Sequence, residues 1–144
     1  MEAAIWTPRR QGNAGELSAI VWLTEAGAWV FKPLFDAPDC DLIADFDDGR
    51  LLRVQVKTST NWERGRFSVA VCTRGGNQSW NRIVKKMDAS RCDYLFVHVG
   101  DGRRWFIPAA AIGGGVSIRV GGPKYADYEV EPGSPLQSRS GSTE

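Results

Sequence analysis

The sequence predicts an α+β domain whose elements follow the order α-β-β-β-β-α-β-β. Two stretches carry apolar residues at helical spacing, several short runs are rich in β-branched and aromatic residues, and clusters of Gly, Pro and Asp separate them. The 144 residues, 42% of them hydrophobic, suffice for one compact core, which we expect to span residues 1–131. Residues 132–144 are mostly Ser, Gly, Pro and charged residues, so we expect a disordered tail there.

The first helix is expected to follow a polar, basic lead-in that ends at Asn13. Asn13 is a candidate N-cap, Leu17 begins a series of apolar residues at helical spacing, and Gly27 provides a stop. Glu16 would then lie in the first turn of the helix. Residues 28–31 follow as a short strand, and residues 34–39 as a loop.

A β-hairpin is expected next, with strands at residues 41–46 and 51–57 joined by a turn at residues 47–49. Side chains alternate between the two faces of a strand. One face of the second strand is therefore polar and the other apolar. The polar members are Arg53, Gln55 and Lys57, and the apolar members are Leu52, Val54 and Val56.

The second half of the chain continues this alternation of elements. A polar loop at residues 59–66 leads to a strand at 67–71, and a second helix is expected at 78–89. The remaining elements are strands at 94–99 and 104–107, a helical turn at 109–112 and a short strand at 116–120.

Composition excludes several classes of protein. No apolar run approaches the roughly 20 residues of a membrane span, and no signal peptide opens the chain, so a cytoplasmic location is expected. The three cysteines are far apart and form no CxxC pair, which favours neither disulfides nor a zinc ribbon. His98 is the only histidine, so two-histidine metal sites are excluded, and we expect it to be a strand residue without chemistry.

The charges are segregated although the net charge is only +1. Residues 1–49 carry three basic and nine acidic side chains, whereas residues 50–104 carry twelve basic and four acidic ones. Of the 18 basic residues, 13 are arginine, whose planar fork suits phosphate groups. This pattern fits a protein that holds a cation beside a polyanion, although solvated surface charge would produce it as well.

Four side chains and one backbone carbonyl predict a site for phosphodiester hydrolysis. That reaction needs an oxygen cluster for a hard cation and a nearby positive charge to orient the attacking water. Asp41 and Gln55 can converge at one edge of the hairpin and supply side-chain oxygens, and the carbonyl of Val56 can add a third ligand. Lys57 would face the attacking water. Glu16, on a helix packed against the sheet, could add a carboxylate or hold a metal-bound water.

Each of these residues also has an ordinary explanation. A Gln-X-Lys on a strand usually belongs to an exposed polar face, and Asp near a strand start usually forms a turn. Glu in a first helical turn is stabilised by the helix dipole. The joint pattern is more specific. A Gly-Glu helix start, a strand that begins with Asp, a hairpin and a strand ending Gln-Val-Lys-Thr occur in a workable order and spacing.

The chain resembles the PD-(D/E)XK nuclease superfamily, and most closely the branch that includes group I intron homing endonucleases. The resemblance covers about residues 10–112. The motifs that carry it are Gly12, Gly15-Glu16, Val30 to Pro33, Cys40 to Asp45, Arg53 to Thr58, Cys92 to Val97 and Trp105 to Pro108.

This resemblance implies a restriction-endonuclease-like fold, with a mixed central β-sheet flanked by helices, and a Mg²⁺-dependent DNA endonuclease that often acts as a homodimer or higher oligomer. Mn²⁺ is a possible substitute. It implies that Asp41 and Gln55 bind the metal, that Lys57 is the catalytic lysine and that Glu16 is the accessory acid. Most of the superfamily has Asp or Glu where this chain has Gln55, which lowers the negative charge at the metal, but the homing branch tolerates Gln there.

Basic residues in the lead-in and after the hairpin are expected to contact DNA, and these are Arg9, Arg10, Arg64, Arg66 and Arg74. Trp62 lies among them and can either stack on nucleic acid or cover the edge of the core. Three alternatives stay open: a Holliday-junction or repair nuclease, a catalytically inactive nucleic-acid-binding member of the same fold, and an interaction module whose tryptophans form a partner surface.

Overall fold

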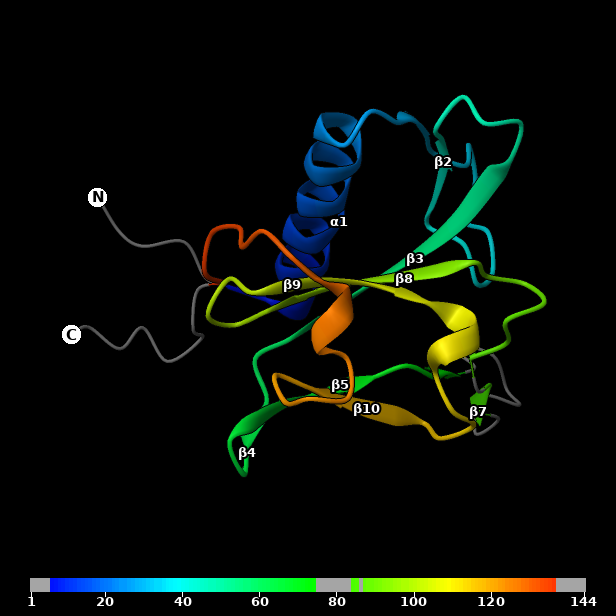
Figure 1. The fold of residues 1–144 in the computed structure, drawn as a ribbon. Coiled ribbons are helices and arrows are strands. Elements are labelled where there is room, and N and C mark those ends of the chain that lie inside the picture. Colours follow the sequence, from blue (N-terminus) through cyan, green and yellow to red (C-terminus); the bar gives the residue numbers. More distant parts are fainter. Residues whose placement is uncertain (1–5, 75–83, 86, 137–144) are drawn as a thin grey trace.

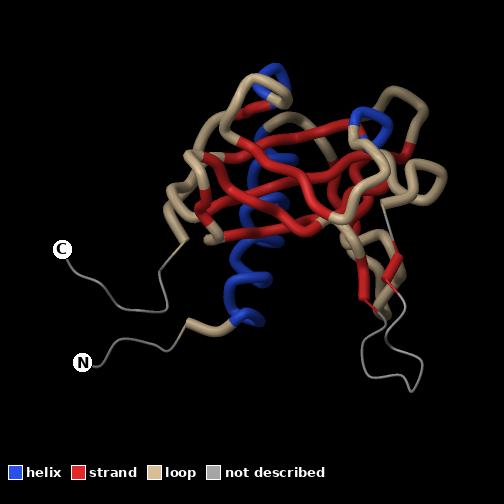
Figure 2. Tube along the Cα trace, turned by 90° about the horizontal axis from the view of Figure 1, so that it is seen from below, coloured by secondary structure: helices blue, strands red, loops and turns tan. Residues whose placement is uncertain are grey.

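The computed structural model describes residues 6–74, 84–85 and 87–136, and these residues form three layers (Figure 1). A helix, α1, lies on one face of a six-stranded sheet. A three-stranded sheet covers part of the other face. Figure 2 shows α1 alongside the strands.

Helix α1 (Pro8–Glu25) begins earlier than the sequence predicts. Its N-cap is Thr7, whose Oγ1 accepts a hydrogen bond of 3.1 Å from the backbone N–H of Arg10, and Pro8 suits the first helical position. The expected N-cap at Asn13 is therefore wrong, because Asn13 lies inside the helix. Glu16 falls in the third turn, so the helix dipole does not explain this acidic residue.

The six-stranded sheet has the order β1-β2-β3-β8-β9-β11. Strands β3 and β8 run parallel and the other neighbours antiparallel, so the predicted mixed sheet and α+β class are confirmed. The predicted hairpin is β2–β3, in which Leu42 pairs with Val54. The strands are β1 (Trp29–Phe31), β2 (Leu42–Asp45), β3 (Leu51–Ser59), β8 (Tyr94–Val99), β9 (Arg104–Pro108) and β11 (Glu129–Val130).

The second sheet has the order β10-β5-β4 and lies on the face of the main sheet opposite α1 (Figure 1). Its strands are β4 (Trp62–Glu63), β5 (Arg66–Ala70) and β10 (Ser117–Val120). Strands β5 and β10 match the predicted strands. Strand β4 was expected to be loop, and it forms because Trp62 pairs with Phe67 across a tight hairpin.

The predicted helix at residues 78–89 is wrong where the structure describes it. Residues Val84–Lys85 form strand β7, which pairs with β6 (Thr73–Arg74), and residues 89–91 form a turn. Residues 78–83 and 86 lie outside the described residues. An amphipathic spacing is shared by helices and irregular segments, and tertiary pairing decides between them.

The C-terminal segment contacts the main sheet rather than leaving it at Pro132. The backbone N–H groups of Gly133 and Leu136 donate to the carbonyls of Gly102 and Gly100, at 2.8 and 3.1 Å, and Leu136 is buried. The expected disorder is therefore wrong for residues 132–136, and residues 137–144 lie outside the described part. Two short 3-10 helices, η1 (Ala109–Ala111) and η2 (Ala126–Tyr128), complete the fold, and η1 matches the helical turn predicted there.

Two apolar cores hold the layers together. The core between α1 and the main sheet contains Ala19, Leu23, Ala28, Leu42, Ala44, Val54 and Phe96. The core between the two sheets contains Phe67, Val69, Val71, Leu95, Val97, Val99, Trp105, Ile107, Ile118, Val120 and Tyr125. Within the described ranges, no helix has the length and apolarity that crossing a membrane requires.

Candidate active site

Strand β3 extends beyond the start of β2, which leaves part of its edge without a strand partner. Asp41 lies at this point, just before β2. Its backbone N–H donates to the carbonyl of Val54 at 2.9 Å, and its Oδ2 accepts a hydrogen bond of 2.7 Å from the N–H of Val56. The carboxylate of Asp41 therefore takes the place of a strand partner, and β3 fixes it next to Gln55 and Lys57.

Gln55 and Lys57 lie on the face of β3 that is turned away from α1, as the alternation predicted. Their partners on β8 are Leu95 and Val97, which belong to the core between the sheets, whereas Val54 belongs to the core under α1. Gln55 is only 8% exposed, so β3 and the layers around it hold its side chain at this edge.

Helix α1 brings Glu16 to this edge through a close contact. Gly15 packs on Thr58 of β3, and a Cβ on Gly15 would overlap the Thr58 methyl group, so only glycine permits this approach. The side chain of Gln11 also donates to Thr58 Oγ1 at 3.0 Å. The Gly-Glu pair of the sequence is thus explained: the glycine sets the distance between helix and strand, and the next residue supplies the acid.

The two acids influence each other. Burial raises the pKa of Asp41 above its usual value, and the negative charge of Glu16 raises it further. The hydrogen bond from Val56 and the positive charges of Lys57 and Lys32 act in the opposite direction. A pair of acids that share a partly buried site is stabilised by a cation, so the electrostatics favour metal binding here.

Sequence reasoning missed Lys32, which belongs to the same site. Its Nζ lies 2.6 Å from Glu16 Oε1, and this hydrogen bond, opposed by partial desolvation, raises the pKa of Lys32. Lys32 directly follows β1, whose Phe31 pairs with Ile43, and it thereby comes close to Asp41. Only the β1–β2 pairing would have revealed it. A cavity of about 250 Å³ lies here, lined by Glu16, residues 32–37, Cys40 and Asp41.

The donor set suits a hard cation. Among the described residues, no three His, Cys, Asp or Glu side chains form a metal-binding group by themselves. Two carboxylates lie at this edge, and with the amide oxygen of Gln55 and the carbonyl of Val56 they would give an all-oxygen set, which Mg²⁺ prefers over softer ligands. The residues present therefore fit such an ion.

Comparison with known proteins identifies the family and the fold. Residues 6–129 match the family model of the PD-(D/E)XK endonucleases. The chain belongs to this family. Its fold is similar to that of a bacterial homing endonuclease, I-Ssp6803I, with a TM-score of 0.72 and 24% identity over 86% of this chain and 89% of that chain.

A second solved structure, the Holliday junction resolvase Hjc of Archaeoglobus fulgidus, has a TM-score of 0.52 and 14% identity over 83% of this chain and 90% of that chain. No curated protein matches the sequence. At these identities the two structures show the fold alone.

The arginines expected to contact DNA occupy different environments in this PD-(D/E)XK protein. Arg9 and Arg10 are exposed in the first turn of α1, and Arg64 is exposed in the turn between β4 and β5. Arg66 is half-buried, and its guanidinium packs over Gly122. The side chain of Arg74 lies outside the described residues.

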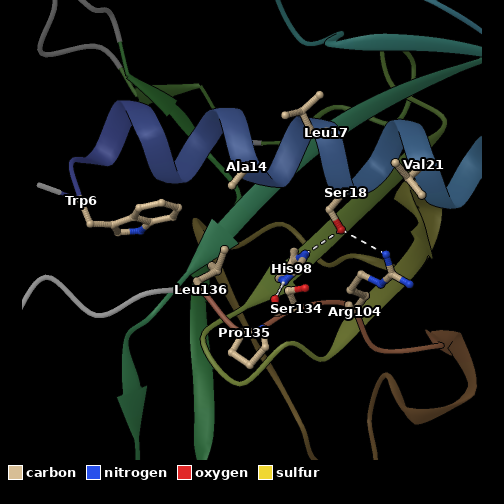
Figure 3. A pocket seen from close by; sticks show the side chains of 11 residues that line it. Trp6, Ala14, Leu17, Ser18, Val21, His98, Arg104, Ser134, Pro135 and Leu136 are labelled. Carbon is tan, nitrogen blue, oxygen red and sulfur yellow. Dashed lines mark hydrogen bonds between the residues drawn. The ribbon is translucent and has the colours of Figure 1, made fainter. Parts of the chain in front are cut away.

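A larger cavity, of about 470 Å³, lies on another side of α1 and surrounds His98 (Figure 3). His98 Nε2 lies 2.7 Å from the carbonyl of Ser134 and must donate to it, so Nδ1 accepts from the hydroxyl of Ser18, also at 2.7 Å. Arg104 in turn donates to Ser18 Oγ at 3.2 Å. Burial lowers the pKa of His98, which favours the neutral ring that this chain of hydrogen bonds requires.

Proposed function

We propose that this protein is a divalent-metal-dependent endonuclease that hydrolyses phosphodiester bonds in DNA. The observation that carries the proposal is the position of Asp41, held by β3 at the unpaired strand edge beside Gln55, with Glu16 close enough to raise its pKa. Membership in the PD-(D/E)XK endonuclease family supports the same chemistry.

Each residue has a separate task in this proposal. Asp41, Gln55, the carbonyl of Val56 and, directly or through water, Glu16 would hold Mg²⁺ or Mn²⁺. The ion, when bound, polarises the phosphoryl group and lowers the pKa of a water. Lys57 projects from the same face of β3 as Gln55, where its ammonium orients the attacking water and balances the charge that develops on the phosphate.

Gln55 and Lys32 together reduce the negative charge of the site. Gln55 is neutral where most of the superfamily has a carboxylate, and Lys32 already neutralises part of Glu16. We therefore expect weaker metal binding than at a site with three carboxylates.

Duplex DNA is the proposed substrate, as for a homing endonuclease. Arg9, Arg10, Arg64, Arg66 and Arg74 belong to the proposed DNA-binding surface, to which each contributes by direct contact or by supporting a contacting element. One site cuts one strand, so double-strand cleavage would require a homodimer or higher oligomer with two-fold symmetry. A cytoplasmic location stays an expectation from the sequence.

The test is a cleavage assay with purified protein on supercoiled plasmid, pooled genomic fragments, a four-way junction and single-stranded DNA. Each substrate is incubated with Mg²⁺, with Mn²⁺ and with EDTA. We expect cutting of duplex DNA that EDTA abolishes and that Asp41→Asn reduces by about 10²-fold or more.

The assay separates the alternatives. Cutting confined to the four-way junction would replace the duplex proposal with a junction-resolving function. DNA binding without cleavage under any of these conditions would identify a catalytically inactive member. If Asp41→Asn cut as fast as wild type, the proposed site would be wrong.

A further inference from the structure

The β4–β5 hairpin carries two side chains that are exposed to solvent. Trp62 is 55% exposed at the start of the hairpin, and Arg64 is exposed in its turn. Figure 1 shows this hairpin projecting from the layer formed by β5 and β10. Exposed tryptophan beside arginine is typical of binding surfaces, where both residue types are enriched.

Arg64 occupies a backbone conformation that disfavours it. Glu63 pairs with Arg66, so the turn contains only Arg64 and Gly65, with φ values of 55° and 81°. This is the geometry of a type I′ turn, in which Asn-Gly is preferred. Arg in the left-handed region costs about 1–2 kcal/mol, and Asn would form the same turn more easily. Folding therefore does not explain the arginine at this position.

The hairpin is held rigidly. The ring of Trp62 packs edge-on against Phe67, with ring centroids 4.8 Å apart, and Arg119 of β10 donates to the carbonyl of Glu63 at 2.8 Å. At the base of the hairpin, Ser68 N–H donates to the carbonyl of Asn61 at 2.9 Å. A rigid element loses little conformational entropy on binding, so its exposed side chains are preorganised.

The position of the hairpin relative to the active site fits DNA. Trp62 follows Lys57 by five residues, so their Cα atoms are at most about 18 Å apart. That upper limit is about half of one turn of B-DNA, so the hairpin lies within roughly five base pairs of Lys57. The second sheet also lies on the same face of the main sheet as Lys57, so a duplex bound at the site would reach the hairpin.

We propose that the β4–β5 hairpin enters the major groove of duplex DNA next to the cleavage site and that Arg64 reads base edges there, supported by Trp62. A two-stranded ribbon fits the major groove, and arginine binds guanine edges through two hydrogen bonds. Arg66 and Arg119 brace the hairpin from behind, because one packs over Gly122 and the other holds Glu63. This inference rests on the proposed nuclease function.

The first test measures binding to a random-sequence duplex of about 30 base pairs, or three helical turns, with Ca²⁺ in place of Mg²⁺ to prevent cleavage. Arg64→Asn is the key variant, because it preserves or improves the turn while removing the side chain. We expect its thermal stability to be equal or higher and its Kd to rise about 5- to 100-fold. Trp62→Ala should raise Kd about tenfold.

Matched controls lie at the other end of β3, about 27 Å away along the strand. Arg50→Asn removes an exposed arginine from the β2–β3 turn, and Trp29→Ala removes an exposed tryptophan from β1. Both should leave Kd within about twofold. Equal Kd values for Arg64→Asn and Arg50→Asn would overturn the proposal, as would a loss of binding confined to single-stranded DNA.

The second test sequences the fragments cut from a randomised duplex pool. Wild type should prefer particular bases within about five base pairs of the cut, and Arg64→Lys, which keeps the charge but loses the fork, should lose that preference. An unchanged preference would overturn the reading of bases by Arg64. If wild type neither binds nor cuts DNA, the proposed function itself fails, whereas normal cutting with no effect of Arg64 defeats the hairpin proposal alone.

Discussion

Two groups of polar side chains contact α1, and they differ in the charges that they bring together. The His98 group consists of Ser18, His98, Arg104 and the carbonyl of Ser134, and each of its polar contacts has a defined donor and acceptor. The β3 edge group consists of Glu16, Lys32, Asp41, Gln55 and Lys57. It contains two acids, one of which has a raised pKa, beside two lysines.

This difference supports the proposal that the β3 edge group is the functional one. The larger cavity lies over the His98 group, and the smaller lies over the β3 edge. Cavity size alone would therefore favour the other region. A buried hydrogen-bond network around a neutral histidine stabilises the fold, whereas acids held together in a partly buried site cost stability and persist where a ligand or reaction requires them.

Replacing Lys57 should have the largest effect. Lys57→Ala removes the charge next to the reacting water and leaves the metal ligands, so the single-turnover cleavage rate at saturating protein should fall about 10²–10⁴-fold. DNA binding should be nearly unchanged. The matched control is Lys124→Ala, an exposed lysine whose Nζ lies 5.4 Å from the centre of the Tyr125 ring. A Lys57→Ala protein that cuts at the rate of the control would exclude this role.

Replacing Arg104 should affect stability and spare chemistry. Arg104 is 8% exposed and donates to Ser18 Oγ and to the carbonyls of Glu131 and Pro132. Arg104→Met leaves these acceptors unpaired and should lower the free energy of unfolding by about 2–4 kcal/mol, measured by urea denaturation. The cleavage rate per folded molecule should not change. The neighbouring Arg103→Met, which breaks a partly exposed pair with Glu129, should cost about 1 kcal/mol or less.

Replacing Gln55 tests whether it is a ligand. Gln55→Glu adds a negative charge to the oxygen set, so the half-saturating Mg²⁺ concentration for cleavage should fall on the order of tenfold. Gln55→Leu removes the oxygen and should shift the same concentration upward. An unchanged metal requirement in both variants would mean that Gln55 does not bind the ion.

The elements nearest the site were predictable because local pattern determines them. The alternation Arg53-Val54-Gln55-Val56-Lys57 and the Asp47-Asp48-Gly49 turn define the hairpin, and the structure has it with the predicted faces. The helix start differs from the prediction because Thr7-Pro8, a cap followed by a proline at the first helical position, begins the helix ahead of Asn13.

Long-range contacts explain the other differences. Lys32 reaches the site only because β1 pairs with β2, and residues 132–136 are ordered by backbone hydrogen bonds to Gly100 and Gly102 that composition cannot reveal. The predicted second helix failed at Val84–Lys85 because these residues pair with Thr73–Arg74. Sequence spacing describes single elements, and none of these contacts lies within one element.

The smallest and most specific difference between the two groups should be the direction in which their contributions to folding stability change with pH. Burial depresses the pKa of His98 below 6.5, so the unfolded chain takes up a proton before the folded protein does. The stability contributed by neutral His98 is present above about pH 6.5 and is lost as pH falls below it. The pKa of Asp41 is raised above 3.8, so its ionisation costs stability as pH rises through the folded value.

Two variants test these two pH dependences separately. The free energy of unfolding of metal-free protein is measured with urea from about pH 4.5 to about pH 7.5. In His98→Gln the new side chain cannot titrate, but its amide can still donate to the carbonyl of Ser134 and accept from Ser18. The free energy of unfolding should therefore fall less on acidification than it does in wild type. Asp41→Asn keeps an acceptor for the N–H of Val56. It should raise the free energy of unfolding at neutral pH by on the order of 0.5–2 kcal/mol, because a functional acid costs stability in exchange for activity. The charges that face His98 from neighbouring elements, Arg104 and Asp101, are present in both variants and cancel in the comparison. A stabilising His98→Gln at neutral pH, or a destabilising Asp41→Asn, would reverse the assignment of the structural and functional groups.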